Sequence, residues 1–274
     1  MYSTCLETAA DTTVTIASGG RRTTVDLYTR EGLEAVAGLW LKLSAEFRLM
    51  YDLTWLGVPI IQLPGDIVMM QELIWRIRPE AIVECGFAHG GSAIFYASIL
   101  ELAGKGEVIG VDVEVRKYNR LAVESHPMAH RIRIVEGSSI DPSTVARIEE
   151  TLLGAAPVIA VLDSNHTTAH VLEEMELYAP LVTPGSYLVV MDGAQAHVWD
   201  TPRGKREWRD DNPLEAIARF LERHPEFEED SRYTRTEVTS SPRGFLRRRR
   251  REEMARPFAP ARRLEPTLEK EAIR

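Results

Sequence analysis

The stretch LDSNHTTAH, residues 162–170, places an aspartate, an asparagine and a histidine within four positions. Asp163, Asn165 and His166 follow directly on the apolar run PVIAV, and His170 comes four residues after His166. A carboxylate can bind a metal ion, and an imidazole can accept a proton near neutral pH. The same residues could instead form a surface loop in which the Asp and Asn side chains cap the next helix. The elements around this stretch decide which other side chains it meets.

Five short apolar runs alternate with helical patterns through the middle of the chain. The apolar runs occupy residues 81–86, 107–113, 131–139, 157–164 and 186–192, and helical patterns occupy residues 91–104, 142–153, 169–182 and 213–223. Strands that alternate with helices in this way predict right-handed βαβ crossovers and a parallel sheet. We therefore expect an α/β, Rossmann-like fold whose mostly parallel sheet is flanked by helices.

Polar residues stand at the carboxyl end of every predicted strand, which is where such a sheet binds its ligands. The first strand leads into the turn ECGFAHGGS, which contains Glu84, Gly86, Ala88, His89, Gly90 and Ser92. The other four strands end at Asp112, at EGSS with Ser138 and Ser139, at LDSNH, and at MDGAQAH with Asp192. We therefore look for the ligand site along this edge of the sheet.

The glycine turn and Asp112 together indicate a nucleoside ligand. Glycines let a ligand approach the backbone closely, and an acid at the end of the next strand can bind a ribose diol. The spacing of Gly86, Gly90 and Gly91 departs from the G-x-G-x-x-G pattern of nicotinamide-binding turns. Glu84, just before the turn, suits a cationic ligand. S-adenosylmethionine carries both a ribose and a sulfonium and fits this turn better.

Composition and charge exclude several other classes of function. The 274 residues carry a net charge of -8, whereas a protein that tracks a nucleic-acid backbone needs a basic face. Only two cysteines are present, which favours a reducing compartment over a disulfide framework. No apolar stretch approaches the roughly 20 residues that span a bilayer. We expect a cytoplasmic protein that acts on a small molecule, without nucleic-acid or membrane partners.

Several long blocks of the chain resemble a known family, in the family's order. These blocks are TWLGVPIIQLPGD, ECGFAHGGSAIFYASIL, VIGVDVEVR, RIRIVEGSSID, VLDSNHTTAHVLEEMELYAPLVTPGSYLVVMD and NPLEAIARFLERHPEF. Over roughly residues 27–247 the chain resembles the cephalosporin hydroxylase-like family. Despite the family name, the resemblance implies a class I methyltransferase fold with a seven-stranded sheet. It also implies S-adenosylmethionine-dependent, metal-assisted O-methylation of a small natural product, such as a sugar of a glycosylated antibiotic.

The resemblance also assigns roles to individual residues. It implies that the glycine turn binds the cofactor, that Asp112 holds its ribose, and that Asp163 and Asp192 bind a divalent metal such as Mg²⁺. Family members often carry two acids at the end of the last strand, but this chain has Met191 before Asp192. Because Mg²⁺ prefers oxygen ligands, Asn165 and Gln195 are the nearest candidates to complete its shell. The missing acid predicts a weaker metal site.

A histidine near the metal would serve as the catalytic base, since a metal-bound hydroxyl is easier to deprotonate. His166 is the first candidate and His197, on the loop GAQAHVWDTPRGKREW, is the second. Trp199 and Trp208 of this loop could form a wall against a sugar or another ring. His166 could equally be a residue that only makes local hydrogen bonds at the start of a helix.

The other histidines of this edge receive different assignments. We expect His89 to lie at the methionine end of the cofactor, and His170, which begins the apolar helical stretch AHVLEEMELYAPLV, to be packed rather than catalytic.

Three other functions remain open at this point. A catechol-type acceptor chelates a metal as well as a vicinal sugar diol does. An iron-dependent oxygenase, suggested by the family name, usually opens its triad with His-x-Asp or His-x-Glu, and no histidine of the predicted site has that spacing. A partner protein could also bind the nucleoside without catalysis, although the two strand-end aspartates argue for an intact site.

The ends of the chain lie outside the alternating pattern. We predict an N-terminal arm and helical extension over residues 1–65, a methyltransferase domain over 66–248 and a charged tail over 249–274. Residues 8–24 are small and polar, and we expect them to be mobile or to lie on a neighbouring subunit of a homo-oligomer. Leu33, Val36, Leu39 and Leu43 form an apolar stripe that predicts a helix packed in the core or at a subunit interface.

Overall fold

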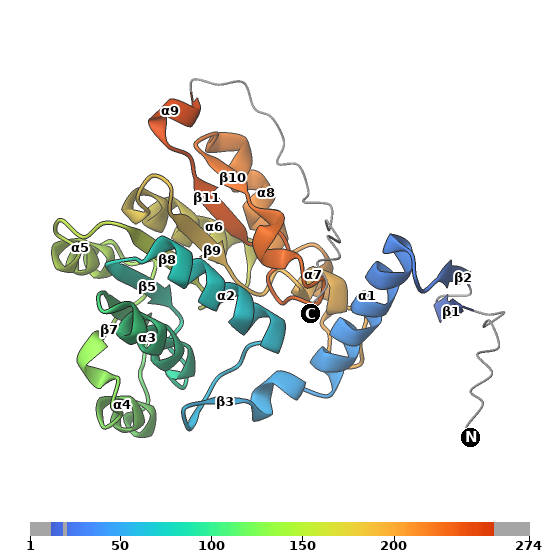
Figure 1. Ribbon diagram of the computed structural model, residues 1–274, viewed down its shortest axis with the longest axis horizontal. Coiled ribbons are helices and arrows are strands. Elements are labelled where there is room, and N and C mark those ends of the chain that lie inside the picture. Colours follow the sequence, from blue (N-terminus) through green and yellow to red (C-terminus); the bar gives the residue numbers. More distant parts are fainter. Residues whose placement is uncertain (1–11, 19–20, 255–274) are drawn as a thin grey trace, which may run out of the picture.

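A seven-stranded sheet forms the centre of the computed structural model, which describes residues 12–18 and 21–254 (Figure 1). Its strand order is β10-β11-β9-β8-β5-β6-β7. The five parallel strands are β5 (Ala81–Cys85), β6 (Glu107–Asp112), β7 (Ile132–Glu136), β8 (Val158–Leu162) and β9 (Tyr187–Val190). All five predicted strands are therefore confirmed, and their carboxyl ends lie along one edge of the sheet.

Helices cover both faces of the sheet. One face packs against α2 (Pro64–Ile77) and α3 (Gly91–Ala103), with α4 (Lys117–Glu124) beside them. The opposite face packs against α5 (Pro142–Thr151), α6 (Thr168–Tyr178) and α8 (Pro213–Arg223). Because side chains alternate along a strand, Ile82 enters the first core while Val83 enters the second. Strands buried on both faces explain the continuous apolar runs in the sequence.

The arginine-rich segment after residue 244 completes the sheet. β11 (Phe245–Arg248) lies between β9 and β10 (Phe227–Glu229) and is antiparallel to both. The short helix α9 (Arg251–Met254) follows, and Arg247 forms ion pairs with Glu228 and Glu253. The basic run is thus a strand end and a helix start; Arg249 also pairs with Glu228, and Arg248 donates to backbone carbonyls such as that of Val182. Of the predicted tail, residues 255–274 lie outside the described part of the chain.

The N-terminal extension consists of a hairpin, a helix and a short second hairpin. β1 (Thr13–Ser18) pairs with β2 (Arg21–Asp26) where we predicted an irregular arm, because alternating Thr and Val residues favour a strand. α1 (Arg30–Glu46) follows, and then β3 (Thr54–Trp55) pairs with β4 (Val58–Pro59). The arm residues before Thr12 lie outside the described part, and the division of the chain at residues 65 and 248 stays a prediction.

The apolar stripe of α1 points away from the rest of the chain, so its predicted place in the core was wrong. Leu33, Val36, Leu39 and Leu43 are 38–46% exposed, and Trp40 beside them is 51% exposed. The helix instead packs through its smaller residues: its buried residues are Gly32, Ala37, Leu41 and Ser44. Other helices already cover both faces of the sheet, so the apolar stripe of α1 has no sheet face to pack against. Periodicity alone did not reveal which side of α1 meets the protein.

None of the helices in residues 12–254 is both long and apolar enough to cross a membrane.

Candidate active site

Two aspartates and a histidine meet where the parallel neighbours β8 and β9 end. Asp163 follows β8, Asp192 follows β9, and His166 lies in the loop before α6. One ligand atom from each of the three residues lies within 4.8 Å of the others, and this is the single such group in the described residues. His166 Nε2 is 3.3 Å from Asp192 Oδ2, and the two side chains are 30% and 36% exposed. The group is therefore partly open to a ligand.

The electrostatics of this group favour a cation. Burial, followed by repulsion from Asp192, raises the pKa of Asp163 well above its usual range. Asp192 itself has a φ of +57°, a left-handed conformation that a non-glycine residue adopts at some cost. Such strained backbone positions cluster at functional sites, where the surrounding structure holds them.

A third acid, which we did not predict, lies close to the first two. Asp66, in the first turn of α2, is fully buried. Its Oδ2 accepts hydrogen bonds of 2.7 Å from the backbone and hydroxyl of Ser240, while its Oδ1 has no partner in the described residues. Burial is the main cause that raises its pKa, and the charge of Asp192 adds to it. The sequence LPGD could have pointed to Asp66, because its proline and glycine mark the start of a helix and place the aspartate in the first turn.

The fourth acid of this region is Glu84, inside β5. It is fully buried, and neither of its carboxylate oxygens has a hydrogen-bond partner among the described residues. Burial raises the pKa of Glu84 to about 8, although the nearby Ser92 hydroxyl acts in the opposite direction and lowers it. An unpaired buried carboxylate is costly unless a cation or a hydrogen-bond donor meets it. No Lys or Arg of the described chain forms an ion pair with Glu84, Asp66, Asp163 or Asp192, so this acidic region could accept a cation from a ligand.

The candidates for completing a metal shell lie in different surroundings. The Asn165 carbonyl accepts hydrogen bonds of 2.9 Å from both the backbone and the hydroxyl of Thr167, so it is used at the start of α6. Gln195 Oε1 is buried and has no partner in the described residues. Met191, at the position of the missing acid, is buried, and its sulfur accepts a hydrogen bond from the Ser241 hydroxyl at 3.2 Å. The places of Asn165 and Gln195 in a metal shell both stay predictions.

The glycine turn packs tightly against the end of β8. Gly86 has a φ of +97°, and a Cβ there would lie 2.2 Å from the backbone oxygen of Asp163, so only glycine fits. Asp112 Oδ2 accepts hydrogen bonds from the backbone amides of Phe87 and Ala88 at 3.0 and 3.1 Å. Asp112 therefore holds the turn in shape, and its Oδ1 receives only a long bond of 3.3 Å from the Glu114 amide.

A cavity of about 180 Å³ opens beside this turn. It is lined by Gly86, Val111, Asp112, Val113, Ser139, Ser164, Asn165 and His170. His170 Nε2 lies 3.3 Å from the Ser139 hydroxyl and 3.2 Å from the Ser164 hydroxyl. Its hydrogen bond to buried Glu174 raises its pKa. We had expected His170 only to be packed, because the sequence did not reveal that Ser139 and Ser164, from two different loops, face this histidine of α6.

The remaining predicted cofactor residues lie around the turn but do not line this cavity. His89 Nδ1 is 3.3 Å from the Asn119 side chain, which also donates to the Ala88 carbonyl at 2.8 Å. Gly90 has a φ of +81° and precedes the start of α3. Ser138 lies in the loop before α5, where its carbonyl accepts a hydrogen bond from the Asp141 amide. Their part in cofactor binding stays a prediction.

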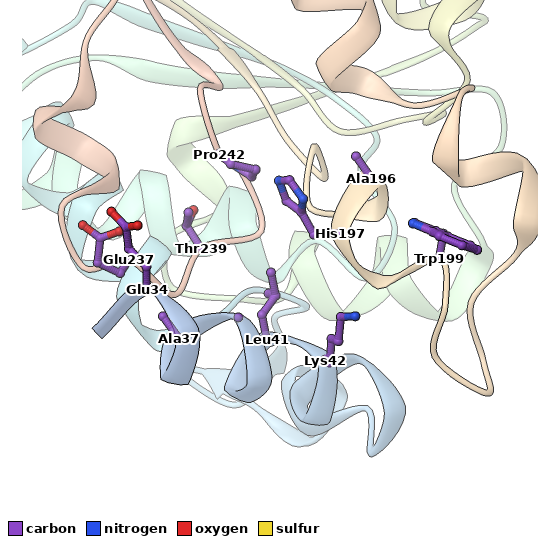
Figure 2. Close-up of a pocket in the computed structure, with 11 residues that line it drawn as sticks. Glu34, Ala37, Leu41, Lys42, Ala196, His197, Trp199, Glu237, Thr239 and Pro242 are labelled. Carbon is purple, nitrogen blue, oxygen red and sulfur yellow. The ribbon is translucent and has the colours of Figure 1, made fainter. Parts of the chain in front are cut away.

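His197 belongs to a second and larger cavity, of about 460 Å³, between α1 and α7 (Gln195–Val198) (Figure 2). Loss of hydration, and then the charge of Lys42, lowers the pKa of His197. Trp199 lines this cavity as well, whereas Trp208 packs against a small core of Leu41, Leu63, Ala194 and Val198. The loop thus supplies one aromatic residue to the cavity wall, and its other tryptophan does not line the cavity.

One histidine outside the site does have the His-x-Glu spacing that oxygenase triads use. His224 contacts Glu226 at 3.0 Å and Glu176 at 2.8 Å, and its ring stacks on Phe220. It lies after α8, and the three-residue metal group of the described chain does not include it. The spacing therefore gives no support to the oxygenase alternative.

Comparison with known proteins identifies the family. The model of the rhamnosyl O-methyltransferase/CmcI family matches residues 47–249. The rhamnosyl O-methyltransferase of Mycobacterium tuberculosis (strain ATCC 25618 / H37Rv) is 32% identical over 202 residues, which cover 70% of this chain and 77% of that protein. The Mycobacterium leprae enzyme of the same name is 30% identical over 201 residues, which cover 72% of this chain and 83% of the relative.

A solved structure supports the same fold at lower identity. CmcI with Mg and S-adenosylmethionine superimposes with a TM-score of 0.52 at 20% identity, over 72% of this chain and 77% of that one. It confirms the class I methyltransferase fold that the family resemblance implied, and with it the mostly parallel sheet that the strand and helix patterns predicted. From the family match and the two mycobacterial relatives, we conclude that the chain belongs to the rhamnosyl O-methyltransferase/CmcI family.

Proposed function

We propose that this protein is an S-adenosylmethionine-dependent O-methyltransferase that methylates a sugar hydroxyl with the help of a divalent metal. The observation that carries the proposal is the group of Asp163, His166 and Asp192, which shares one sheet edge with the cavity at the glycine turn. The family and the name of the mycobacterial relatives support methyl transfer to a sugar. The acceptor would be part of a small natural product.

The residues of the turn fit S-adenosylmethionine. Its ribose diol would donate to Asp112, whose Oδ1 is the less occupied oxygen. Its ammonium would meet Glu84, whose buried carboxylate has no protein partner among the described residues. Its adenosine would enter the cavity beside Ser139 and His170. The solved CmcI structure with Mg and S-adenosylmethionine supports this choice of cofactor.

The two aspartates fit a divalent cation. Asp163 and Asp192 offer carboxylate oxygens, which Mg²⁺ prefers, and the buried Gln195 oxygen lies three residues further along the chain. His166 offers nitrogen, a poor ligand for Mg²⁺. When bound, the cation would make the acceptor hydroxyl more acidic and S-adenosylmethionine would supply the methyl group.

Because the two aspartates would hold the metal, His166 is the residue of this group that would act as the catalytic base. Its imidazole would take the proton of the acceptor hydroxyl, and Asp192 at 3.3 Å would orient the ring and stabilise its protonated form. The acceptor oxygen then forms the new bond to the methyl carbon as the bond from that carbon to sulfur breaks. The proton remains on His166 until solvent removes it.

A homo-oligomer also stays a prediction. The surface that we propose for it is the outward stripe of α1, where Leu33, Leu43 and Trp40 form an apolar face that no other described part of the chain covers. A second copy of the chain, with the same stripe, would bury both faces against each other.

Divalent metal should control the activity. We expect Mg²⁺ or Mn²⁺ to stimulate methyl transfer to an aryl rhamnoside, and a chelator to suppress it, because two repelling carboxylates hold the acceptor poorly without a cation. The measurement is mass-spectrometric detection of the methylated product after exhaustive chelation and after metal is restored. Full activity without metal would refute the metal role. Methylation of a catechol, but not of any glycoside, would favour the catechol-type alternative.

A further inference from the structure

The larger cavity has one wall that comes from outside the family's matched region. Figure 2 shows α1 along one side, with Ala37, Leu41 and Lys42, and His197 with Pro242 on the other. α1 ends at residue 46, whereas the family match begins at residue 47. This wall therefore lies just outside the residues that the family model matches.

The opposite wall is directly connected to the acidic site. Thr239 lines the cavity, and the next residue, Ser240, makes the two 2.7 Å hydrogen bonds to Asp66. The Ala194 amide donates to the Ser240 carbonyl at 2.9 Å, which joins this segment to the chain that follows Asp192. Two segments, residues 192–199 and 239–242, thus contribute both to the cavity and to the surroundings of the metal-binding candidates.

A glycine in the middle of α1 marks where the cavity needs space. Gly38 lines the cavity, and a Cβ built there would meet no atom within 4 Å. By contrast, a Cβ at Gly32 of the same helix would lie 2.0 Å from the Asp26 carbonyl, so packing explains that residue. Glycine inside a helix costs about 1 kcal/mol relative to alanine. Gly38 therefore borders open space in the cavity, where a methyl group would fit and a larger side chain would fill part of the volume.

The charges of the cavity wall are matched within the protein. Glu34 and Glu237 both pair with Arg30, and Lys42 pairs with Asp200 at 2.6 Å. These groups still offer hydrogen bonds, but the described residues that line the cavity include no cluster of unpaired cations to hold a phosphate. The wall therefore suits an uncharged ligand that is rich in hydroxyl groups. Trp199 adds an aromatic surface on which a sugar ring can pack.

We propose that this cavity is the acceptor site, that α1 forms its outer wall, and that it takes an uncharged glycosyl group rather than a nucleotide-linked sugar. The proposal rests on the proposed function and names its acceptor more closely. Gly38 then leaves the space in which the ring, or the group attached to it, lies.

Two substitutions at Gly38 test the position of the site. Gly38→Leu should fill the cavity and weaken the binding of p-nitrophenyl rhamnoside at least 10-fold, as measured by calorimetric titration. Gly38→Ala is the matched control, which adds one methyl group and should bind the glycoside nearly as the wild type does. Both variants should melt no lower than the wild type, since leucine and alanine favour a helix. Equal binding by wild type and Gly38→Leu would overturn the proposal.

The class of acceptor is tested with a charged analogue. The wild type should bind p-nitrophenyl rhamnoside at least 10-fold more tightly than dTDP-rhamnose. Trp199→Ala should lose the binding of p-nitrophenyl rhamnoside. The matched control Trp75→Ala, at an exposed tryptophan of α2, should keep it. Tighter binding of the nucleotide-linked sugar would overturn the inference about charge. All of these are binding measurements, and cofactor binding is titrated separately. A variant that loses the glycoside but keeps S-adenosylmethionine supports this site even if the proposed chemistry fails.

Discussion

Turnover of a His166→Ala variant is expected to fall about 10²–10⁴-fold, the usual scale for the loss of a general base. His166 lies 3.3 Å from Asp192, and its nitrogen is a poor Mg²⁺ ligand beside two carboxylates, so proton transfer is the role that would be lost. Metal should still raise the melting temperature of the variant. Single-turnover kinetics with saturating cofactor, together with thermal melts with and without Mg²⁺, measure both properties.

His197→Ala is the informative comparison. His197 lies in the larger cavity, so its loss should weaken acceptor binding more than it slows the chemical step. A fully active His166→Ala variant beside an inactive His197→Ala variant would move the base to the cavity wall. If His166→Ala instead loses its metal-dependent stabilisation, His166 is a metal ligand.

Asp163→Asn should remove most of the activity and most of the metal-dependent rise in melting temperature. Asp163 and Asp192 repel each other without a cation, and this repulsion contributes to the raised pKa of Asp163. The metal-free variant should therefore melt higher than the metal-free wild type, while added Mg²⁺ changes its melting temperature little.

Calorimetric titration should find S-adenosylmethionine binding by Asp163→Asn nearly unchanged, because its proposed contacts lie mainly on Glu84 and Asp112. Asp210→Asn, at a surface acid whose side chain is 88% exposed, is the matched control and should respond to metal as the wild type does. A normal metal-dependent shift in Asp163→Asn would place the cation elsewhere.

The sheet and the acids at its edge could be predicted because both follow from local patterns. Strands buried on two faces read as apolar runs, and the chain reverses at their ends, where Asp112, Asp163 and Asp192 stand. Asp66 could not be found in this way, because it lies at the start of a helix rather than at the end of a strand. Its proximity to Asp192 results from how α2 packs across the sheet.

The sequence also could not show that α1 lines the larger cavity. The period of α1 is clear, but periodicity gives the spacing of an apolar stripe and not the partner that covers it. In the structure the stripe faces outward, and the smaller residues Gly32, Ala37 and Ser44 face the protein. The role of Gly38 follows only from the empty space beside it.

The burial of Glu84 has a consequence for how the cofactor binds. With a pKa of about 8, this side chain is mostly a neutral acid in the free protein at pH 7. A bound ammonium would require the carboxylate, so binding at pH 7 would release a proton to the solvent. The measured heat would then include the ionisation enthalpy of the buffer and differ between phosphate and Tris. Cofactor affinity would rise as the pH increases from about 6 to about 7.5, because less free energy is then needed to ionise Glu84.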